Sequence, residues 1–390
     1  MSFVTGTATD YANLLNLLDT FLTSTGMALA PSFVGTGNGV MSGWLGGSAG
    51  VAEIITVTFS SATAFTVAGS VSGSIGSGTT GTAFTSTKVN FTITAGGTAF
   101  VSGDAFTVSV TPPWTSERRT AGVEMIWQAP GNGGLDAILV GANVFSDVGG
   151  NYYNWRLGGF TAFNSAVVFN QQAGYVGGAS QANPSPVLTL WNSSIPYWFI
   201  ANGRRVIVIA KVSTVYACAY LGFMNSYMAP GAYPYPLVVG GNLAFPVEPA
   251  TGSANWRWSY TGAEISNFAI PQASITQDFA SSLRLMQSVG AWRGFNIQAN
   301  GTSVGKVFPY CGLAPSNWDW RPDLDGGYSL LPVVLADGTP NVYGELDGVF
   351  GLTGFSNAVE NTVTLNGVAH LVVQNVFRNT KSDFFAVRLS

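Results

Sequence analysis

Two groups of carboxylates are the residues whose types come nearest to a reactive arrangement. Asp319, Asp323 and Asp325 form one group, Glu345 and Asp347 form the other, and each lies beside tryptophan or tyrosine residues. Glycosidases need two placed acids, and aromatic neighbours of this kind resemble a sugar subsite. No spacing pairs these acids specifically, and acids in the turns of a β scaffold explain both groups. Polysaccharide hydrolysis is therefore the weakest of the three functional hypotheses that the sequence allows.

A catalytic serine or cysteine would need an imidazole beside it, and the chain has one histidine, His370. Residues 368–373 around it have the pattern of a strand, which favours a structural role for this ring. Residues 46–50 and 301–305 match the Gly-x-Ser-x-Gly pattern of a nucleophile elbow, but neither has the required buried strand before it and helix after it. The sequence predicts no catalytic residue, and we expect no enzyme.

Metal and cofactor motifs are incomplete. Residues 323–326 (Asp-Leu-Asp-Gly) begin like a calcium loop, but the later ligand positions and the closing glutamate are missing. The glycine-rich residues 35–39 lack the lysine of a phosphate-binding loop. Cys218 and Cys311 are the only thiols, and their apolar neighbours indicate buried free cysteines. We expect no metal, no cofactor and no disulfide scaffold.

The scarcity of charge is the main compositional feature. Only 9% of the 390 residues are charged, the net charge is −4, and 47% are hydrophobic. Ordinary globular domains carry about a quarter charged residues. A chain with this composition cannot cover itself with charge as a solitary monomer does, so we expect much of its surface to contact other subunits. Eleven arginines against four lysines fit that expectation, because interface cores favour arginine.

The distribution of charge also argues against two classes of partner. Basic residues are scattered, apart from Arg118-Arg119 and Arg204-Arg205, so no basic stripe predicts nucleic-acid binding. The longest apolar runs, such as residues 215–224, fall short of the ~20 residues that a membrane-spanning helix needs. Residues 1–4 lack the features of a signal peptide, so we expect folding in the cytoplasm.

Two helices are expected. Apolar residues recur at helical spacing between Tyr11 and Leu22, Thr7 lies three residues before Asp10 as a capping signal, and Gly26 can end the helix. A second, weaker helix is predicted over residues 272–288. The first helix either covers its own domain or packs on a neighbouring subunit.

The rest of the chain predicts a mainly β fold in three parts. Residues 1–50 hold the helix and a lead-in, as part of the main domain. Residues 51–113, rich in Gly, Ser and Thr, form a small inserted β-sandwich or barrel module rather than a flexible linker. Residues 114–390 form the main antiparallel sandwich or jelly-roll-type domain, with a subdivision near 245–290.

Alternating or apolar runs give the expected strands. The sequence Asn202-Gly203 favours a tight hairpin turn, so residues 198–201 and 205–212 should pair antiparallel. The predicted strands are residues 53–59, 88–94, 104–110, 123–128, 137–144, 151–156, 166–170, 198–201, 205–212, 216–223, 330–335, 342–346, 363–365, 368–376 and 384–389.

Four runs carry a family resemblance. They are residues 151–160 (Asn-Tyr-Tyr-Asn-Trp-Arg-Leu-Gly-Gly-Phe), 202–211 (Asn-Gly-Arg-Arg-Val-Ile-Val-Ile-Ala-Lys), 233–241 (Tyr-Pro-Tyr-Pro-Leu-Val-Val-Gly-Gly) and 373–378 (Val-Gln-Asn-Val-Phe-Arg). Over residues 114–390 the chain resembles virion structural proteins of tailed bacteriophages, a class without a diagnostic active-site motif. Residues 95–104 look like part of the small β modules appended to phage head and tail proteins.

The resemblance implies a structural component of a virion, assembled in the host cytoplasm and placed most plausibly in the tail or baseplate. Its partners would be copies of itself and other virion proteins. The alternative is a capsid decoration or a receptor-binding protein that contacts a host-surface glycan, through the 51–113 module or through aromatic loops such as residues 318–328.

Overall fold

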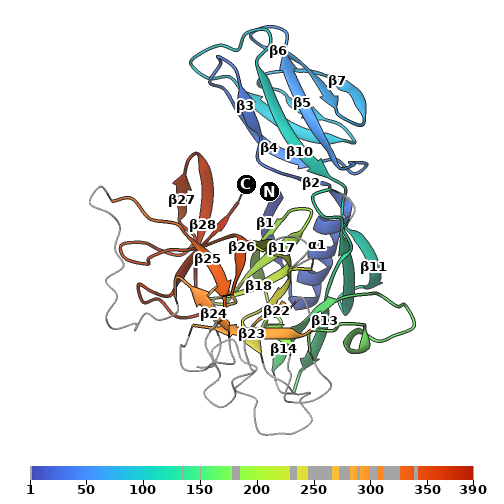
Figure 1. The fold of residues 1–390 in the computed structure, drawn as a ribbon, viewed down its shortest axis with the longest axis vertical. Helices are drawn as coiled ribbons and strands as arrows, with labels where there is room; N and C mark the ends of the chain where they lie inside the picture. Colours follow the sequence, from blue (N-terminus) through green and yellow to red (C-terminus); the bar gives the residue numbers. More distant parts are fainter. Residues whose placement is uncertain are drawn as a thin grey trace.

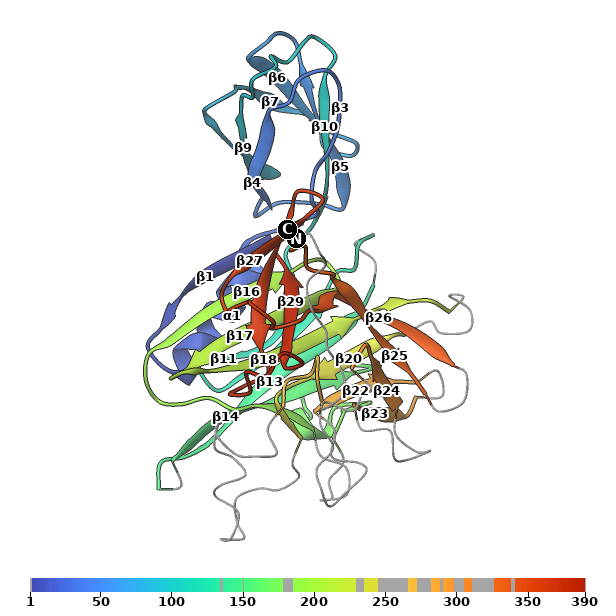
Figure 2. The same ribbon diagram turned by 90° about the vertical axis from the view of Figure 1, so that its left-hand side faces the viewer.

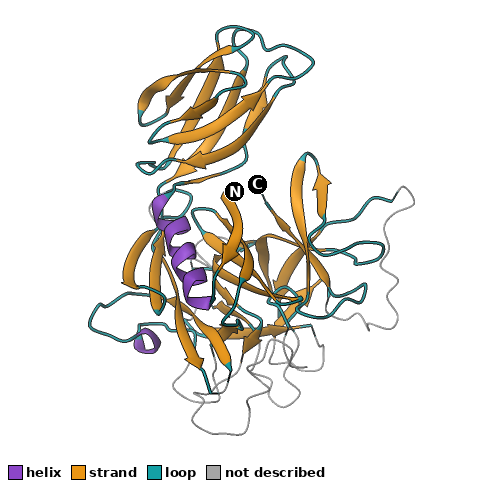
Figure 3. Cartoon of the chain, turned by 180° about the vertical axis from the view of Figure 1, so that it is seen from behind, coloured by secondary structure: helices purple, strands orange, loops and turns teal. Residues whose placement is uncertain are grey.

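The computed structural model describes residues 2–133, 136–149, 151–177, 185–228, 235–244, 266–271, 282–287, 290–297, 305–310, 326–337 and 341–389. It is mainly β, with antiparallel sheets and one short α-helix near the N-terminus, which confirms the predicted fold class (Figure 3). A small β module stands above a larger body, and both termini lie at the base of the module (Figure 1). In the part of the chain described, no helix is long and apolar enough to cross a membrane.

Two small sheets form the module. The first runs β2-β10-β5-β6-β7, with β3 also pairing β10, and the second runs β4-β9-β8. Their bounds are β2 Met27–Ala28, β3 Ser32–Val34, β4 Val40–Gly46, β5 Glu53–Phe59, β6 Ala64–Gly69, β7 Gly73–Thr79, β8 Ala83–Thr85, β9 Val89–Thr94 and β10 Ala105–Thr111. Residues 27–46, expected in the lead-in, supply β2, β3 and β4 because their apolar side chains, such as Met41, join the module's phenylalanine-rich core.

The N-terminal helix α1 spans Tyr11–Ser24, but its capping residue is Asp10 and not Thr7. Asp10 Oδ1 accepts hydrogen bonds of 2.8 Å from the backbone N–H groups of both Ala12 and Asn13. Thr7 lies instead in a strand that the sequence did not predict, β1 (Ser2–Ala8), where it pairs with Pro196. The seven-residue strand pairing takes precedence over the local capping signal.

A sandwich closed by α1 forms one half of the body. One of its sheets is β11 (Thr115–Thr120), β12 (Glu124–Ala129), β13 (Ile138–Asp147), β14 (Tyr152–Phe160), β15 (Pro186–Leu188) and β21 (Leu243–Ala244). The other begins with β1, β16 (Ile195–Ala201), β17 (Arg205–Val212), β18 (Val215–Phe223) and β20 (Leu237–Gly240). Helix α1 contacts β1, β16 and β11, and its Leu14, Leu15, Leu18 and Leu22 are completely buried in the core between the two sheets.

The second sheet continues past β20 and curls back over its own strands. Its later strands, in order of pairing, are β22 (Leu283–Met286), β23 (Trp292–Asn296), β24 (Gly305–Phe308), β25 (Leu331–Ala336), β26 (Val342–Gly351), β29 (Phe384–Arg388), β28 (Val368–Gln374) and β27 (Thr362–Leu365), with β19 (Asn225–Ser226) pairing β26. Residues of β25, β26, β28 and β29 share a second core with β16, β17 and β18. The body therefore has three layers.

Strands β17 and β18 form the middle layer and are buried on both faces. Val206 and Val208 point into the first core, whereas Ile207 and Ile209 point into the second. All nine residues of β18 are buried. A strand covered on both faces reads as a continuous apolar run instead of an alternation. The predicted hairpin is confirmed, because Ala201 pairs with Val206 and β16 runs antiparallel to β17.

Two predicted elements are wrong. The helix expected over residues 272–288 is contradicted where the chain is described, because β22 alternates between the cores, with Leu283 and Leu285 in one and Met286 in the other. Residues 272–281 and 288–289 lie outside the described part. The strand expected at 166–170 is a turn followed by a 3-10 helix (Phe169–Gln171), because the Gln172 side chain bonds to the backbone of Asn164 and Val167.

Leu18→Ala tests whether α1 closes the sandwich. Removing this completely buried side chain should lower the free energy of unfolding by about 2–5 kcal/mol. Leu17→Ala, at a half-buried position of the same helix, is the matched control and should cost clearly less. Urea denaturation followed by tryptophan fluorescence measures both. Equal losses would contradict the packing described for α1.

Candidate functional site

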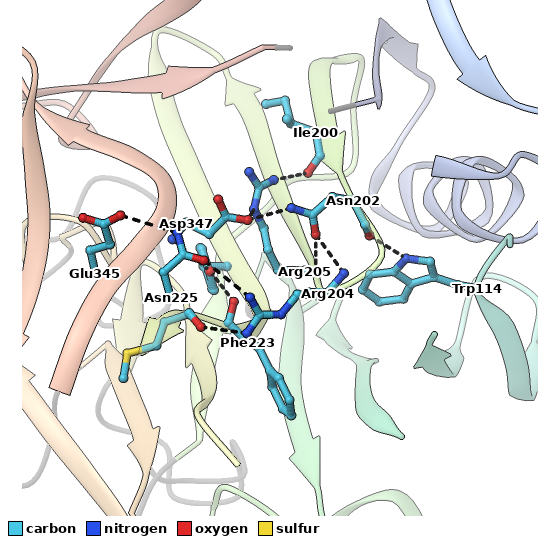
Figure 4. A network of polar contacts seen from close by, with 11 residues as sticks. Trp114, Ile200, Asn202, Arg204, Arg205, Phe223, Asn225, Glu345 and Asp347 are labelled. Carbon is cyan, nitrogen blue, oxygen red and sulfur yellow. Dashed lines mark hydrogen bonds and ion pairs between the residues drawn. The ribbon is translucent and has the colours of Figure 1, made fainter. Parts of the chain in front are cut away.

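The most buried charged group in the described structure is the guanidinium of Arg205, at the start of β17. Its side chain has 0% exposure, and its Nε lies 3.2 Å from Asp347 Oδ2 on β26 in the opposite layer (Figure 4). Nη1 of Arg205 also donates to the Ile200 carbonyl at 3.1 Å. A buried charge is tolerated only when it is paired and hydrogen-bonded. This pair therefore fixes the third layer against the middle one.

Asn202, in the hairpin turn, organises the same network. Its Nδ2 donates to Asp347 Oδ2 at 2.6 Å, and its Oδ1 accepts the backbone N–H groups of Arg204 and Arg205 at 2.8 and 3.0 Å. Its backbone carbonyl accepts a 2.9 Å hydrogen bond from the indole of Trp114, which immediately precedes β11 (Figure 4). One turn residue thus connects all three layers of the body.

Asp347 is held in its charged form. Burial acts to raise the pKa of this carboxyl, but the charge of Arg205 and the hydrogen bond from Asn202 outweigh burial and lower it. An aspartate with a lowered pKa stays ionised near neutral pH and cannot act as a general acid there. The network stabilises the fold and offers no proton to a substrate.

Glu345, the other acid predicted on this strand, is also occupied. The Tyr227 hydroxyl donates to its Oε2 at 2.6 Å. Asn225 Nδ2 donates to its Oε1 at 3.4 Å, as Figure 4 shows. Burial, together with the bond to Glu345, raises the pKa of Tyr227 to about 12. Glu345 and Asp347 therefore share β26 but are bound to different internal partners. Asp319, Asp323 and Asp325 lie outside the described residues.

A second cluster of polar and charged side chains connects the loop before β27 with strands β17 and β18. Lys211 Nζ donates to Glu360 Oε1 at 2.7 Å, and the Tyr216 hydroxyl donates to the same oxygen. The hydrogen bond between Lys211 and Glu360 raises the pKa of Lys211. Burial, and after it the hydrogen bond between Tyr216 and Glu360, raises the pKa of Tyr216 to about 12. Both donors hold their protons at neutral pH, so neither can act as a base, and both engage the ionised Glu360 carboxylate.

His370 has the geometry of a structural histidine. It is buried on β28, its Nδ1 lies 3.0 Å from the Val368 carbonyl, and its ring packs edge-on against Phe350. Burial lowers the pKa of the imidazole, so the ring is neutral near pH 7. The elbow-like residues 46–50 end β4 and continue into a turn without a helix, and residues 301–304 lie outside the described part.

The glycine-rich loop at residues 35–39 already holds an anion from its own chain. The backbone N–H groups of Thr36 and Gly37 donate to the Asp104 carboxylate at 3.0 and 2.9 Å, and Val101 N donates to it at 3.1 Å. The bond from Thr36, followed by those from Gly37 and Val101, outweighs burial and lowers the pKa of Asp104. The donors that could bind a phosphate are therefore already engaged.

Thiols and metal ligands give no further site among the described residues. Cys218 is a buried free cysteine on β18, and burial raises the pKa of its thiol well above the ordinary value. Such a thiol is unreactive. Cys311 lies outside the described part. Within the ranges that the structure describes, no three His, Cys, Asp or Glu residues are grouped so that they could hold a metal ion.

Comparisons with known proteins give little likeness. No family model matches the chain, and no curated protein matches it. One solved structure that it matches in part is FlgL from Xanthomonas campestris, with 22% identity over 23% of this chain and 29% of that one. The TM-score is 0.19, so this match carries no argument about fold or function.

These comparisons correct the resemblance to tailed-bacteriophage virion structural proteins. No phage family model and no curated phage protein matches the chain, so no sequence relationship stands behind that resemblance. Where the structure describes them, the short aromatic and glycine-rich runs that suggested the resemblance lie in strands and the segments between them, which many unrelated β proteins need. The expected place in a virion rested on that resemblance and is not carried further.

The residues that organise this site escaped prediction for a physical reason. The sequence marks Asn202 as a turn residue and Arg205 as one of a basic pair at the start of a predicted strand, and neither pattern indicates a buried ion pair. A usable signal exists: Arg205 opens an unbroken apolar run, and a charge at the end of a strand buried on both faces needs a buried partner. Nothing in the sequence could show that the partner is Asp347, because 142 residues separate the two.

Asp347→Asn should destabilise the protein strongly. The substitution removes the carboxylate charge that pairs with the completely buried Arg205, and breaking a buried pair in this way costs about 3–5 kcal/mol. Glu345→Gln, on the same strand, is the control and should cost much less. The double variant Arg205→Met with Asp347→Leu should recover most of the loss. Urea denaturation measures all of them, and equal stability of the two single variants would contradict the role of the pair.

The pair should also show in the pH dependence of stability. Because the pKa of Asp347 is lowered in the folded state, its contribution is complete above the unfolded value of 3.8 and disappears as the pH falls below it. The difference in unfolding free energy between wild type and Asp347→Asn should therefore be constant from about pH 7 to 5 and shrink below about pH 4. Denaturation of both proteins across this range measures it. A difference that does not change with pH would contradict the assignment.

Proposed function

We propose that this chain is a structural subunit of a larger protein assembly, and that it acts through contacts with copies of itself and with neighbouring proteins. The observation that carries the proposal is the internal use of its few charges. Among the described residues, five basic side chains form ion pairs within the chain, namely Arg118, Arg119, Arg205, Lys211 and Arg293, with Glu124, Asp19, Asp347, Glu360 and Asp337 respectively.

Other acidic side chains are also bound within the chain, by hydrogen bonds from the backbone. Glu53 accepts hydrogen bonds from the backbone of Val71 and Ser72, as Asp104 does from the backbone of residues 36, 37 and 101. The 9% of charged residues therefore overstates the charge that the surface presents to another molecule. Net charge and its repulsion keep ordinary monomers apart, and this chain has little of either. Association with protein surfaces is the function that such a surface suits best.

No feature of residues 27–113 supports glycan binding by the module. Proteins bind sugar-like ligands through concave sites lined with accessible aromatic rings. Every aromatic side chain of residues 27–113 is buried or half-buried, and the rings pack on one another, as Phe59 does on Phe100 with centroids 3.9 Å apart. Residues 311–325, which include most of the proposed aromatic loop, lie outside the described part. Glycan binding is therefore not put forward as a second function.

Sedimentation velocity of the purified chain tests the proposal. We expect species heavier than the 40.7 kDa monomer whose fraction rises with protein concentration. Because few of the charged residues in the described ranges are exposed, raising the salt from about 0.1 to 1 M should leave the association largely intact, whereas a contact made by ion pairs would weaken. A single 40.7 kDa species at every concentration, with no other protein co-purifying, would contradict the proposal.

A further inference from the structure

The free edges of the sheets differ in how well they are protected against pairing with another strand. Natural proteins protect such edges with charge, proline, bulges or short length. Edge strand β11 carries Glu117, Arg118 and Arg119 together with a bulge. Strands β4 and β7 pair with their neighbours through register shifts, and β27 and β8 have only four and three residues.

Strand β1 has none of these protections. It is seven residues long (Ser-Phe-Val-Thr-Gly-Thr-Ala), contains no charge and no proline, and pairs with β16 without any shift of register. It ends the fourteen-stranded sheet and runs along the upper left margin of the body in Figure 2. Alternate backbone N–H and C=O groups of an edge strand point away from the sheet and lack a partner in it.

We propose that β1 pairs antiparallel with β1 of a second copy of this chain, across a twofold axis at Thr5. This inference rests on the proposed function and names its first interface. A twofold interface must be self-complementary. Thr5 is the middle residue of β1, so a twofold axis there pairs all seven residues, setting Phe3 opposite Thr7 and Val4 opposite Gly6 of the partner strand.

The two faces of β1 fit this arrangement. Val4 and Ala8 point into the first core, while Phe3, Thr5 and Thr7 are exposed on the other face. Phe3 is 43% exposed, and the added strand would place a threonine beside its ring. No charged residue meets another across the axis. An uncharged strand paired with itself brings no unpaired charge into the interface, which favours a second copy over a charged peptide.

The antiparallel direction also keeps the two small modules apart. Ser2 Oγ accepts a 3.2 Å hydrogen bond from Ala28 N at the base of the module, so the module lies at the Ser2 end of β1. In the dimer the partner's Ser2 lies beside Ala8 of the first copy. The two modules would therefore stand at opposite ends of the paired strands.

Disulfide trapping tests the axis directly. In a Cys311→Ser background, with Cys218 completely buried, Thr5→Cys places two thiols opposite each other, where paired residues have Cβ atoms about 4.5–5.5 Å apart. Thr7→Cys, equally exposed on the same strand, is the matched control, because the two copies of that residue would lie about 13 Å apart along the strands. Mild oxidation should give a covalent dimer with Thr5→Cys and at least tenfold less with Thr7→Cys.

The results of these experiments distinguish a failure of the β1 interface from a failure of the proposed function. If wild type associates but the two cysteine variants cross-link equally or not at all, the β1 interface is wrong and the proposed function stands. If wild type is monomeric at every concentration and binds no other protein, both fail. As a check that does not depend on a thiol, Phe3→Lys should weaken self-association at least tenfold, whereas Val123→Lys, at a similarly exposed position, should not. Unchanged association of Phe3→Lys would overturn the β1 interface.

Discussion

The burial of β17 and β18 on both faces is the constraint on which the rest of the body depends. One face packs on the sheet of β11–β15 and the other on the returning strands of the same fourteen-stranded sheet. Since neither face meets water, both must be apolar, and the few polar groups in this layer must be paired inside the protein. The buried Arg205–Asp347 pair, organised by Asn202, meets that requirement at the end of the layer where the hairpin turns.

The same requirement explains why several polar residues that look reactive in sequence are engaged with partners inside the described structure. Asp347 is kept ionised by Arg205, and Glu345 is bound by Tyr227 and Asn225. The glycine-rich loop of the module binds the carboxylate of Asp104. In each arrangement a charged side chain holds together segments that lie far apart in sequence. The described part of the surface therefore presents few free charges, and this observation underlies the proposed contacts with other proteins.

Local patterns predicted this fold well where one neighbour decides the structure. The Asn202-Gly203 turn gave the correct hairpin, and the alternation in residues 53–59 matches β5. Prediction failed where packing against segments remote in sequence decides the local structure. Leu283 and Met286 have helical spacing, yet they belong to a strand between two cores, and Thr7 can cap a helix, yet it pairs with β16. The resemblance to phage proteins failed because short aromatic and glycine-rich runs are common to many β proteins.

Hydrogen exchange of β1 at several protein concentrations tests most directly whether this chain works through contacts with its own copies. Backbone amides of residues 2–8 that point away from β16 should exchange quickly in dilute solution and become protected at high concentration, when a second β1 pairs with them. The amides of β17, buried in the middle layer, should be protected at every concentration. If the exchange of β1, and of every other segment, were independent of concentration, self-association would be contradicted.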